Sequence, residues 1–159
     1  MTRELSRWGV GPSILLPTGA YAVVAGLATW LWPDPCLITA VPQSVFIVAG
    51  IVLLAIGVPM LAVAGRAATV AYNSDKLATS GIFGLTRNPI YAAWIVLIIP
   101  GLVLLSRSWP LLLTPIVAYS AFKCRIRRED EYLEERFGDE YRRYEARVNE
   151  LIPGRTRHV

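Results

Sequence analysis

A short stretch in the middle of the chain carries residues suited to binding an anionic ligand. Residues 81–88 read Gly-Ile-Phe-Gly-Leu-Thr-Arg-Asn, and Pro89 follows them. Glycine lets the backbone turn tightly and approach a ligand closely, and proline suits the first turn of a helix. A helix N-terminus beside Arg87 is a favourable site for a carboxylate or a phosphate. The residues alone leave a plainer alternative open, in which Arg87 marks the end of a membrane span and the glycines only form a turn.

A second candidate is the pair Arg125 and Glu129, which lie one helical turn apart and share a helix face. An exposed pair at this spacing contributes only about 0.3–0.5 kcal/mol, so stability gives little reason for it. A functional role is one interpretation. The other is an ordinary solvated helix, because further charged residues surround the pair: Arg127, Arg128, Asp130 and Glu131.

Composition shows what must position these residues. The chain has 159 residues, of which 54% are hydrophobic and only 18% charged, against about a quarter charged in soluble proteins. From residue 10 to residue 65 the single charged residue is Asp34, whereas residues 123–159 hold ten of the sixteen basic and nine of the twelve acidic residues. We therefore predict one all-α integral membrane domain over residues 1–159, with a water-exposed tail.

Four stretches are apolar enough to span a bilayer, whose core takes about 20 helical residues. Pro33 and Pro35 end the first, since a proline lacks the donor that a continuing helix needs. Residues 106–108 join the last two so closely that they must form an antiparallel hairpin. The predicted spans are residues 12–32, 42–64, 88–105 and 109–124.

The cytoplasmic tail, residues 125–152, is predicted to be helical. Apolar residues recur there at three- and four-residue steps among the charges. Gly138 should divide the tail into two helices, the second starting at an Asp139 N-cap, and Pro153 should end it. The recurring residues are Leu133, Phe137, Tyr141, Tyr144 and Val148.

The basic residues predict the orientation of this multi-pass membrane protein. Fifteen of them, Arg3 and Arg7 included, flank the spans on one side, and Arg107 alone lies on the other. Because Lys and Arg accumulate on the cytoplasmic side, both termini should be cytoplasmic, at the inner membrane if the source is bacterial. The same rule accounts for the net charge of +4, so we predict membrane lipid as a partner and no nucleic acid.

Metal and disulfide chemistry are not expected. His158 has no partner histidine, which makes a metal site improbable. Cys36 and Cys124 lie on opposite sides of the predicted membrane, too far apart for a disulfide.

Two blocks of the sequence resemble the isoprenylcysteine carboxyl methyltransferase and phospholipid methyltransferase family of integral membrane enzymes. The first block, residues 77–91, is similar to the family's Leu-x-Thr-x-Gly-x-Tyr followed by Arg-His-Pro-x-Tyr. The second, residues 125–153, is similar to its Arg-x-x-x-Glu-Glu-x-x-Leu, then Phe-Gly, paired tyrosines, a valine and Ile-Pro. Together they cover roughly the C-terminal half, and one helical hairpin separates them.

The resemblance implies an S-adenosylmethionine-dependent methyltransferase, with S-adenosylhomocysteine as product and the tail capping the cofactor pocket. A lipophilic or lipidated acceptor would enter from the bilayer. Arg125 matches the position that orients the acceptor and, with Glu129, forms the candidate catalytic pair. Glu129 could instead only anchor the cofactor. The predicted cofactor contacts are Asp75, Lys76, Leu77, Ala78, Phe83, Asn88, Pro89, Ile90, Tyr91 and Glu129, and the loop's own chemistry adds Gly81 and Arg87.

Three positions depart from the family pattern. Asn88 replaces the usual histidine, Phe83 the usual tyrosine and Asp130 the second glutamate. Asparagine can donate and accept hydrogen bonds but cannot titrate near neutrality. The site must therefore need hydrogen bonding there more than a proton, and if it needs a proton, this chain is impaired. The acceptor stays open between a prenylated cysteine carboxylate, a phospholipid amine and another lipophilic thiol or acid.

Two alternatives belong to other classes. Membrane sterol reductases carry a similar Arg-x-Pro-x-Tyr region that binds a nicotinamide dinucleotide, although this chain is short for their extra spans. A non-enzymatic four-helix membrane scaffold is the other alternative. Binding of S-adenosylmethionine, of a nicotinamide dinucleotide or of neither separates the three.

Overall fold

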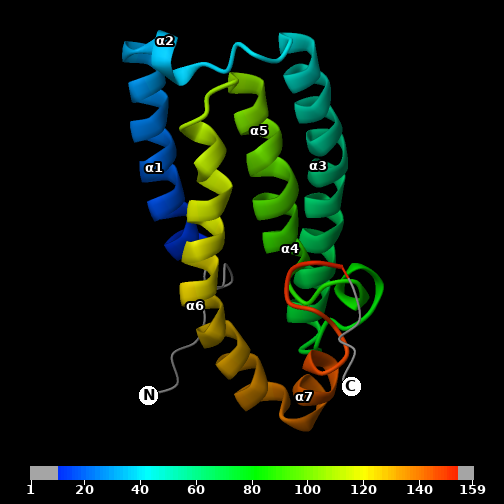
Figure 1. Ribbon diagram of the computed structural model, residues 1–159. Helices are drawn as coiled ribbons and strands as arrows, with labels where there is room; N and C mark the ends of the chain where they lie inside the picture. Colours follow the sequence, from blue (N-terminus) through cyan, green and yellow to red (C-terminus); the bar gives the residue numbers. More distant parts are fainter. Residues whose placement is uncertain (1–10, 154–159) are drawn as a thin grey trace.

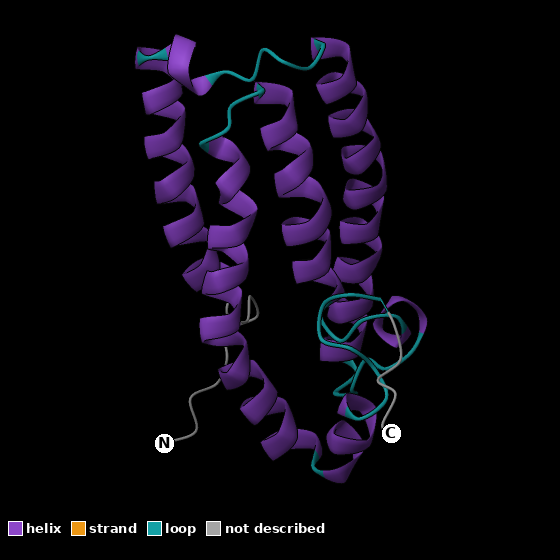
Figure 2. Cartoon of the chain, in the orientation of Figure 1, coloured by secondary structure: helices purple, strands orange, loops and turns teal. Residues whose placement is uncertain are grey.

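Four long helical segments, each antiparallel to the next, form the protein (Figure 1). The computed structural model describes residues 11–153, so Arg3, Arg7 and His158 lie outside the described residues. Apart from a few bridge residues, among them Leu37 paired with Ser108, the regular structure in this range is helical (Figure 2), which confirms the all-α prediction. The long segments are α1 (Gly11–Leu31), α3 (Gln43–Asn73), the continuous α4 (Pro89–Ala92), η2 (Ala93–Ile98) and α5 (Ile99–Ser106), and α6 (Thr114–Phe137).

Three of these segments are long and apolar enough to cross a membrane: residues 11–31, 43–73 and 89–106. Only 17% of the most apolar stretch of α1, and the same share of α3, is buried inside the protein. Their exposed side chains include Leu16, Val24 and Ile51, which in water would make a large apolar surface. Lipid is the solvent that suits such helices, and the first three predicted spans are confirmed as candidates.

Tryptophan marks one end of the bundle. Trp30 and Trp32 are exposed beside α2 (Pro33–Cys36), and exposed Trp109 donates from Nε1 to the Pro35 carbonyl at 2.8 Å. Tryptophan is enriched at membrane–water interfaces, because its ring is apolar while its N–H can form hydrogen bonds with polar groups and water. Arg107 lies at this same end, in the turn after α5, so the bilayer boundary lies close to these residues.

Helix α3 extends well beyond its apolar part. We predicted a loop from Arg66 onward, but the helix continues to Asn73 and the loop begins at Ser74. The apolar stretch ends near Ala64, whereas no proline interrupts the next nine residues, so the charge at Arg66 ends the membrane span without ending the helix. At 1.5 Å per residue α3 is about 46 Å long, against about 30 Å for a bilayer core.

Helix α6 also passes from apolar to charged sequence without a break. The fourth span was predicted at residues 109–124, but the α-helix begins at Thr114, because a turn and the short η3 (Leu111–Leu113) precede it. It then continues to Phe137 through residues assigned to a separate tail. Its apolar half is short, and it is not among the three candidate spans of the described chain. Its crossing stays a prediction.

The rest of the tail is less helical than predicted. Gly138, at φ +53°, does break it, and α7 (Asp139–Glu145) follows. Gly138 rather than Asp139 is the N-cap, and Asp139 is the first helical residue. The helix was expected to continue nearly to Pro153 but ends at Glu145. The carbonyls of Asn149 and Glu150 accept hydrogen bonds from the loop before the third span instead of from the helix.

The helices associate as two pairs. α1 packs mainly on α6, and α3 packs on the continuous α4–η2–α5 segment. Both pairs contribute residues to one shared core, and Leu151 of the tail also packs in it. The core residues are Ile14, Ala92, Ile95, Ala118, Phe122, Ile126 and Leu151.

Glycine allows α3 and α5 to approach closely. A Cβ on Gly50 would lie 2.8 Å from the Gly101 carbonyl oxygen and 2.8 Å from Leu105 Cδ2, and a Cβ on Gly101 would lie 3.1 Å from the Gly50 oxygen. A neighbouring side chain can rotate away, but a helix carbonyl cannot. Small residues at such contacts are a general feature of helix association in membranes.

We predict that Gly50→Ala destabilises the protein by about 1–3 kcal/mol, the usual effect of overpacking. Thermal unfolding in detergent measures this as a lower midpoint. Gly65→Ala is the matched control in the same helix, because nothing lies within 4 Å of its Cβ position. That change should leave the midpoint unchanged or raise it, since alanine is the better helix former. Equal midpoints for the two variants would contradict the close packing of α3 on α5.

Candidate functional site

The two sequence blocks meet where the third span begins. The Tyr91 hydroxyl, on α4, donates to Glu129 Oε2, on α6, at 2.9 Å. The Tyr91 ring also contacts the ring of Phe122, with 5.3 Å between centroids. Pro89 occupies the first turn of α4, as predicted, and is fully buried. Tyr91 and Glu129 therefore join the beginning of a span to the aqueous half of α6.

Arg125, the other candidate catalytic residue, lies one turn before Glu129 on α6 and is exposed. The half-buried Ile90 precedes Tyr91 in α4. The predicted pair Arg125 and Glu129 is thus on one continuous helix, at the level where its apolar sequence ends.

The loop before the third span presents some predicted site residues to solvent and others to the tail. Asp75, Lys76 and Gly81 are exposed, and Gly81 has φ +60°, which explains the glycine. Ala78 is half-buried, and Leu77 packs against Tyr141, Tyr144 and Val148. Phe83 lies in η1 (Gly81–Gly84), and its carbonyl accepts a hydrogen bond from Tyr144 Oη at 2.7 Å.

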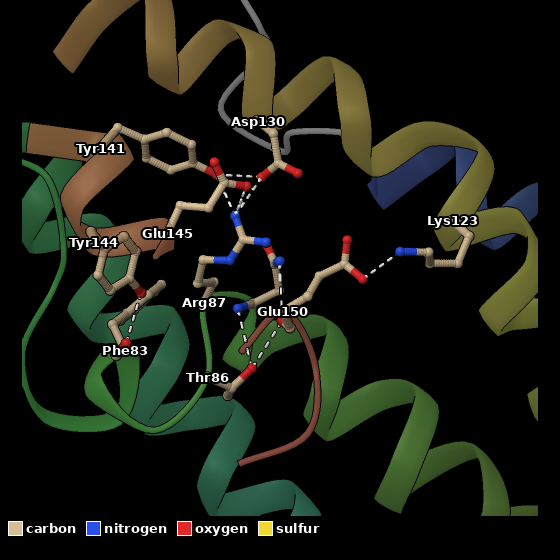
Figure 3. A network of polar contacts seen from close by, with 10 residues as sticks. Phe83, Thr86, Arg87, Lys123, Asp130, Tyr141, Tyr144, Glu145 and Glu150 are labelled. Carbon is tan, nitrogen blue, oxygen red and sulfur yellow. Dashed lines mark hydrogen bonds and ion pairs between the residues drawn. The ribbon is translucent and has the colours of Figure 1, made fainter. Parts of the chain in front are cut away.

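The side chain of Arg87 is directed at the tail. Its Nη1 lies 2.6 Å from Glu145 Oε1, 3.6 Å from Asp130 Oδ1 and 3.2 Å from the Tyr141 hydroxyl (Figure 3). Tyr141 in turn donates to Asp130. The Arg87 side chain is only 11% exposed, so the guanidinium is a largely buried cation between two carboxylates. In this arrangement Arg87 holds the tail on the loop.

Burial shifts the pKa values of the groups around Arg87. It raises the pKa of the Asp130 carboxyl, although Tyr141 and Arg87 partly oppose the shift. Burial also raises the pKa of Tyr144 to about 12, and burial and the bond to Asp130 raise that of Tyr141. Both tyrosines therefore stay protonated at neutral pH and act as hydrogen-bond donors to the loop and to Asp130.

The tail also binds the residues just before the third span. Arg87 N–H donates to the Asn149 carbonyl at 2.8 Å, and Asn88 N–H donates to the Glu150 carbonyl at 3.1 Å. The Asn88 side-chain Nδ2 and the Thr86 hydroxyl donate to the same Glu150 oxygen, at 3.2 and 3.0 Å. The backbone donors that we expected to hold a cofactor carboxylate bind the tail here. These bonds also explain why the helix does not continue beyond Glu145.

Segment 148–151 reaches the membrane core through this contact. Glu150 Oε2 lies 2.7 Å from Lys123 Nζ, on α6, as Figure 3 shows. Leu151 is buried among residues of α1, α4 and α6. The end of the tail is therefore held by a polar contact, from Glu150 to Lys123, and by an apolar one, the burial of Leu151.

Comparison with known proteins identifies the family. The sequence model of the phospholipid methyltransferase family matches residues 38–140, which is more than half of the chain. The chain belongs to this family. Members of this family are S-adenosylmethionine-dependent methyltransferases, the enzyme class and cofactor that the sequence resemblance implies.

Curated relatives agree with the resemblance seen in the sequence. The chain is 34% identical over 82 residues to protein-S-isoprenylcysteine O-methyltransferase of Schizosaccharomyces pombe, covering 51% of this chain and 35% of that protein. It is 33% identical over 78 residues to the Dictyostelium discoideum enzyme of the same name, covering 49% and 33%. The Arabidopsis thaliana enzyme B is 30% identical over 78 residues, covering 49% and 40%. The chain thus spans between a third and two fifths of these relatives. No solved structure matches.

Sequence reasoning missed the tail residues that organise this candidate site. Asp130 was noted as a surrounding charge and as a departure from the family pattern, and Tyr141 and Tyr144 as part of a helix face and of the second sequence block. Glu145 and Glu150 were not singled out. Arg87, the single basic residue in the second half of the loop, was a usable signal. If such a cation is buried, it requires acidic partners, and the acidic residues of the tail are the candidates.

A surface hollow of about 580 Å³ lies beside α7. It contains none of the predicted site residues, and we do not assign the cofactor to it. It is lined by Thr79, Glu140, Arg143, Ala146 and Arg147.

We predict that Arg87→Gln loosens the tail, because it leaves Asp130 and Glu145 close together without their cation. The loss should be about 1–3 kcal/mol, the cost of leaving a buried polar group without its partner. Limited trypsin digestion reads this out, since Arg142 and Arg143 on α7 are exposed. Cleavage should become about tenfold faster or more. Arg66→Gln, at an exposed arginine on α3, is the control, and equal rates for both variants would contradict the role of Arg87.

We also predict that Asn88 is needed as a hydrogen-bond donor and not for a proton. Asn88→His keeps a donor for the Glu150 carbonyl, so tail protection should persist equally at pH 6 and pH 8. Asn88→Asp places a carboxylate against that carbonyl and should destabilise the tail by about 1–3 kcal/mol. The same digestion measures both variants. Strong pH dependence in Asn88→His, or full protection in Asn88→Asp, would overturn this role.

Proposed function

We propose that this chain methylates a lipophilic acceptor at the end of the membrane domain where Tyr91, Arg125 and Glu129 lie. One observation carries the proposal. The 2.9 Å bond from Tyr91 to Glu129 joins the two sequence blocks of the family resemblance, which are far apart in the chain. A half-buried carboxylate beside aromatic rings, at the membrane end of a polar helix, is a suitable place for a charged cofactor to meet an apolar substrate.

The residues present fit S-adenosylmethionine by their chemistry. The cofactor has an adenine ring, ribose hydroxyls, a sulfonium and an amino-acid end. Glu129 can accept hydrogen bonds from hydroxyl or amine groups, and the ring of Tyr91 offers a face for adenine or for the sulfonium. In the loop, Asp75 supplies a further exposed carboxylate. When bound, the cofactor supplies an activated methyl group on a cationic sulfur.

The chain's own contribution is binding, alignment and exclusion of water. We propose that Glu129 anchors the cofactor and that Tyr91 orients the Glu129 carboxylate through the observed hydrogen bond. Arg125 lies one turn closer to the membrane on the same helix. Its planar guanidinium can bind a carboxylate or a phosphate with two parallel hydrogen bonds. We therefore assign it to orienting an anionic acceptor that arrives from the lipid.

The acceptor class follows from this assignment and from the relatives. An arginine suits a carboxylate or a lipid phosphate, and the curated relatives are named for isoprenylcysteine and for O-methyl transfer. We propose a lipid-soluble carboxylate as the first acceptor to test. We further propose that the site faces the cytoplasm, as the basic residues predict, and that the apolar half of α6 completes a fourth span.

Calorimetric binding to the detergent-purified protein tests this proposal. Wild type should bind S-adenosylmethionine and S-adenosylhomocysteine at micromolar concentration. Glu129→Gln retains an acceptor for Tyr91 but removes the charge, and should weaken both by about tenfold or more, as expected for a hydrogen bond to a charged group. Arg125→Gln should bind the cofactor normally yet fail to transfer radiolabelled methyl to lipid extracts that wild type methylates.

Arg127→Gln and Glu131→Gln are matched controls, since these two form an exposed ion pair on the same helix. Neither control should alter binding or transfer. Absence of cofactor binding to folded wild type would overturn the proposal as a whole. Normal transfer by Arg125→Gln would overturn only the role of that residue.

A further inference from the structure

Two large apolar side chains are exposed beside the contact between the loop and the tail. Leu85 is 58% exposed and Ile152 is 70% exposed. Leu85 directly precedes Thr86, and Ile152 lies two residues after Glu150. The Thr86 hydroxyl donates to the Glu150 carbonyl at 3.0 Å, so both side chains adjoin the same tertiary contact.

Elsewhere in these two segments the large apolar side chains are at least partly covered. Among the described residues 120–153, Ile152 is the only exposed one, and Leu85 is the only one in residues 74–90, all of which the structure describes. Val148, four residues before Ile152, is buried. A single exposed apolar side chain is ordinary on a protein surface in water. What distinguishes these two is the level at which they lie along the bundle.

The neighbours of Ile152 place it at the boundary of the membrane core. Glu150 binds Lys123, with 2.7 Å between Oε2 and Nζ, and Lys123 is the first charged residue of α6. Leu151 is buried in the core of the helical bundle. Charged side chains near the end of an apolar helix extend to the headgroup layer. Ile152 therefore lies at the edge of the bilayer, and Figure 1 shows this red end of the tail turning back from α7 toward α4.

Leu85 lies at the same boundary. It precedes Pro89, the first residue of the third candidate span, by four residues. The N–H groups of Arg87 and Asn88, between these two residues, donate to consecutive carbonyls of the tail. The loop and the end of the tail are thus held at one level, where the lipid-facing surface of the spans ends.

We propose that Leu85 and Ile152 insert into the lipid at this boundary and that the bilayer thereby holds the tail on the loop. The partner is the apolar layer of the membrane just beneath the headgroups. Hydrophobic attraction is non-directional, so this contact needs no pocket, only apolar side chains at the right depth. Its strength scales with the apolar area buried, and it adds to the polar bonds between the loop and the tail. Holding the tail in this way is independent of the methyl acceptor and of the roles of Arg125 and Glu129.

Without lipid, Ile152 would have little part in holding the tail. Its side chain is 70% exposed, so replacing it by serine would remove few contacts within the protein. If lipid covers Ile152, the same replacement removes apolar burial. Half-burying an isoleucine side chain corresponds to about a fivefold change in an equilibrium constant.

Spin labelling in phosphatidylcholine nanodiscs measures the depth of the two side chains. The labels are attached to Ile152→Cys and Leu85→Cys, in protein whose own cysteines are replaced by serine. Collisions with oxygen, which concentrates in the bilayer, should exceed those with a nickel chelate, which stays in water. Ile51→Cys, exposed on the α3 span, is the lipid control, and Glu135→Cys, exposed on the charged half of α6, is the water control. A label at either position that matches the water control overturns the proposal.

Limited trypsin digestion in the same nanodiscs, where both faces of the bilayer are accessible, tests the effect on the tail. Ile152→Ser should speed cleavage at the exposed Arg142 and Arg143 by about fivefold. Ile152→Leu keeps the apolar area and should behave as wild type.

Ile51→Ser is the matched control for digestion, because it makes the same change at another exposed isoleucine, on the α3 span. It should leave the cleavage rate unchanged. A wild-type rate in Ile152→Ser contradicts the contact with lipid. So does an equal acceleration in Ile51→Ser, which would show a general loosening of the protein.

Discussion

The candidate site depends on the burial of one guanidinium. Arg87 lies against Glu145, Asp130 and Tyr141, and these residues come from both helices of the tail. A buried cation without such partners would be strongly disfavoured, so the tail must fold back for the loop to adopt this conformation. The same contact places segment 148–151 against the start of the third span, and it keeps α6 in the direction that brings Glu129 to Tyr91.

The membrane imposes the second constraint. Inside a bilayer every backbone group must be satisfied within the helix, so irregular structure is confined to the ends of the bundle. α3 and α6 both continue past the apolar region, which carries regular helix into water. The candidate site lies at this end of the bundle, where Tyr91 at the start of the third span meets Glu129 on the extension of α6. Close glycine packing between α3 and α5 keeps the membrane half compact.

Much of this architecture could be predicted from the sequence, for identifiable reasons. Apolar length predicts spans well, and Pro33, Pro89 and Gly138 mark boundaries because their backbone chemistry is local. The end of α3 was missed because solvation changes at Arg66 while helix propensity does not. The end of α7 was missed because Asn149 and Glu150 bond to the loop, a tertiary contact that no local pattern contains. Candidate site residues were predicted from the family resemblance, whereas the residues that they contact could be identified only from the coordinates.

The three departures from the family pattern lie at the contacts between the loop and the tail, and the structure gives each a use. Phe83 lacks the hydroxyl of tyrosine, but its contribution here is a backbone carbonyl bound by Tyr144. Asn88 lacks a titrating ring, but its amide donates to the Glu150 carbonyl. Asp130 is shorter than glutamate and still reaches Tyr141, next to Arg87. Each contact needs a donor or an acceptor in place, and none needs a proton transferred. The substitutions therefore preserve the tail's attachment, which is the geometry that positions Glu129 beside Tyr91.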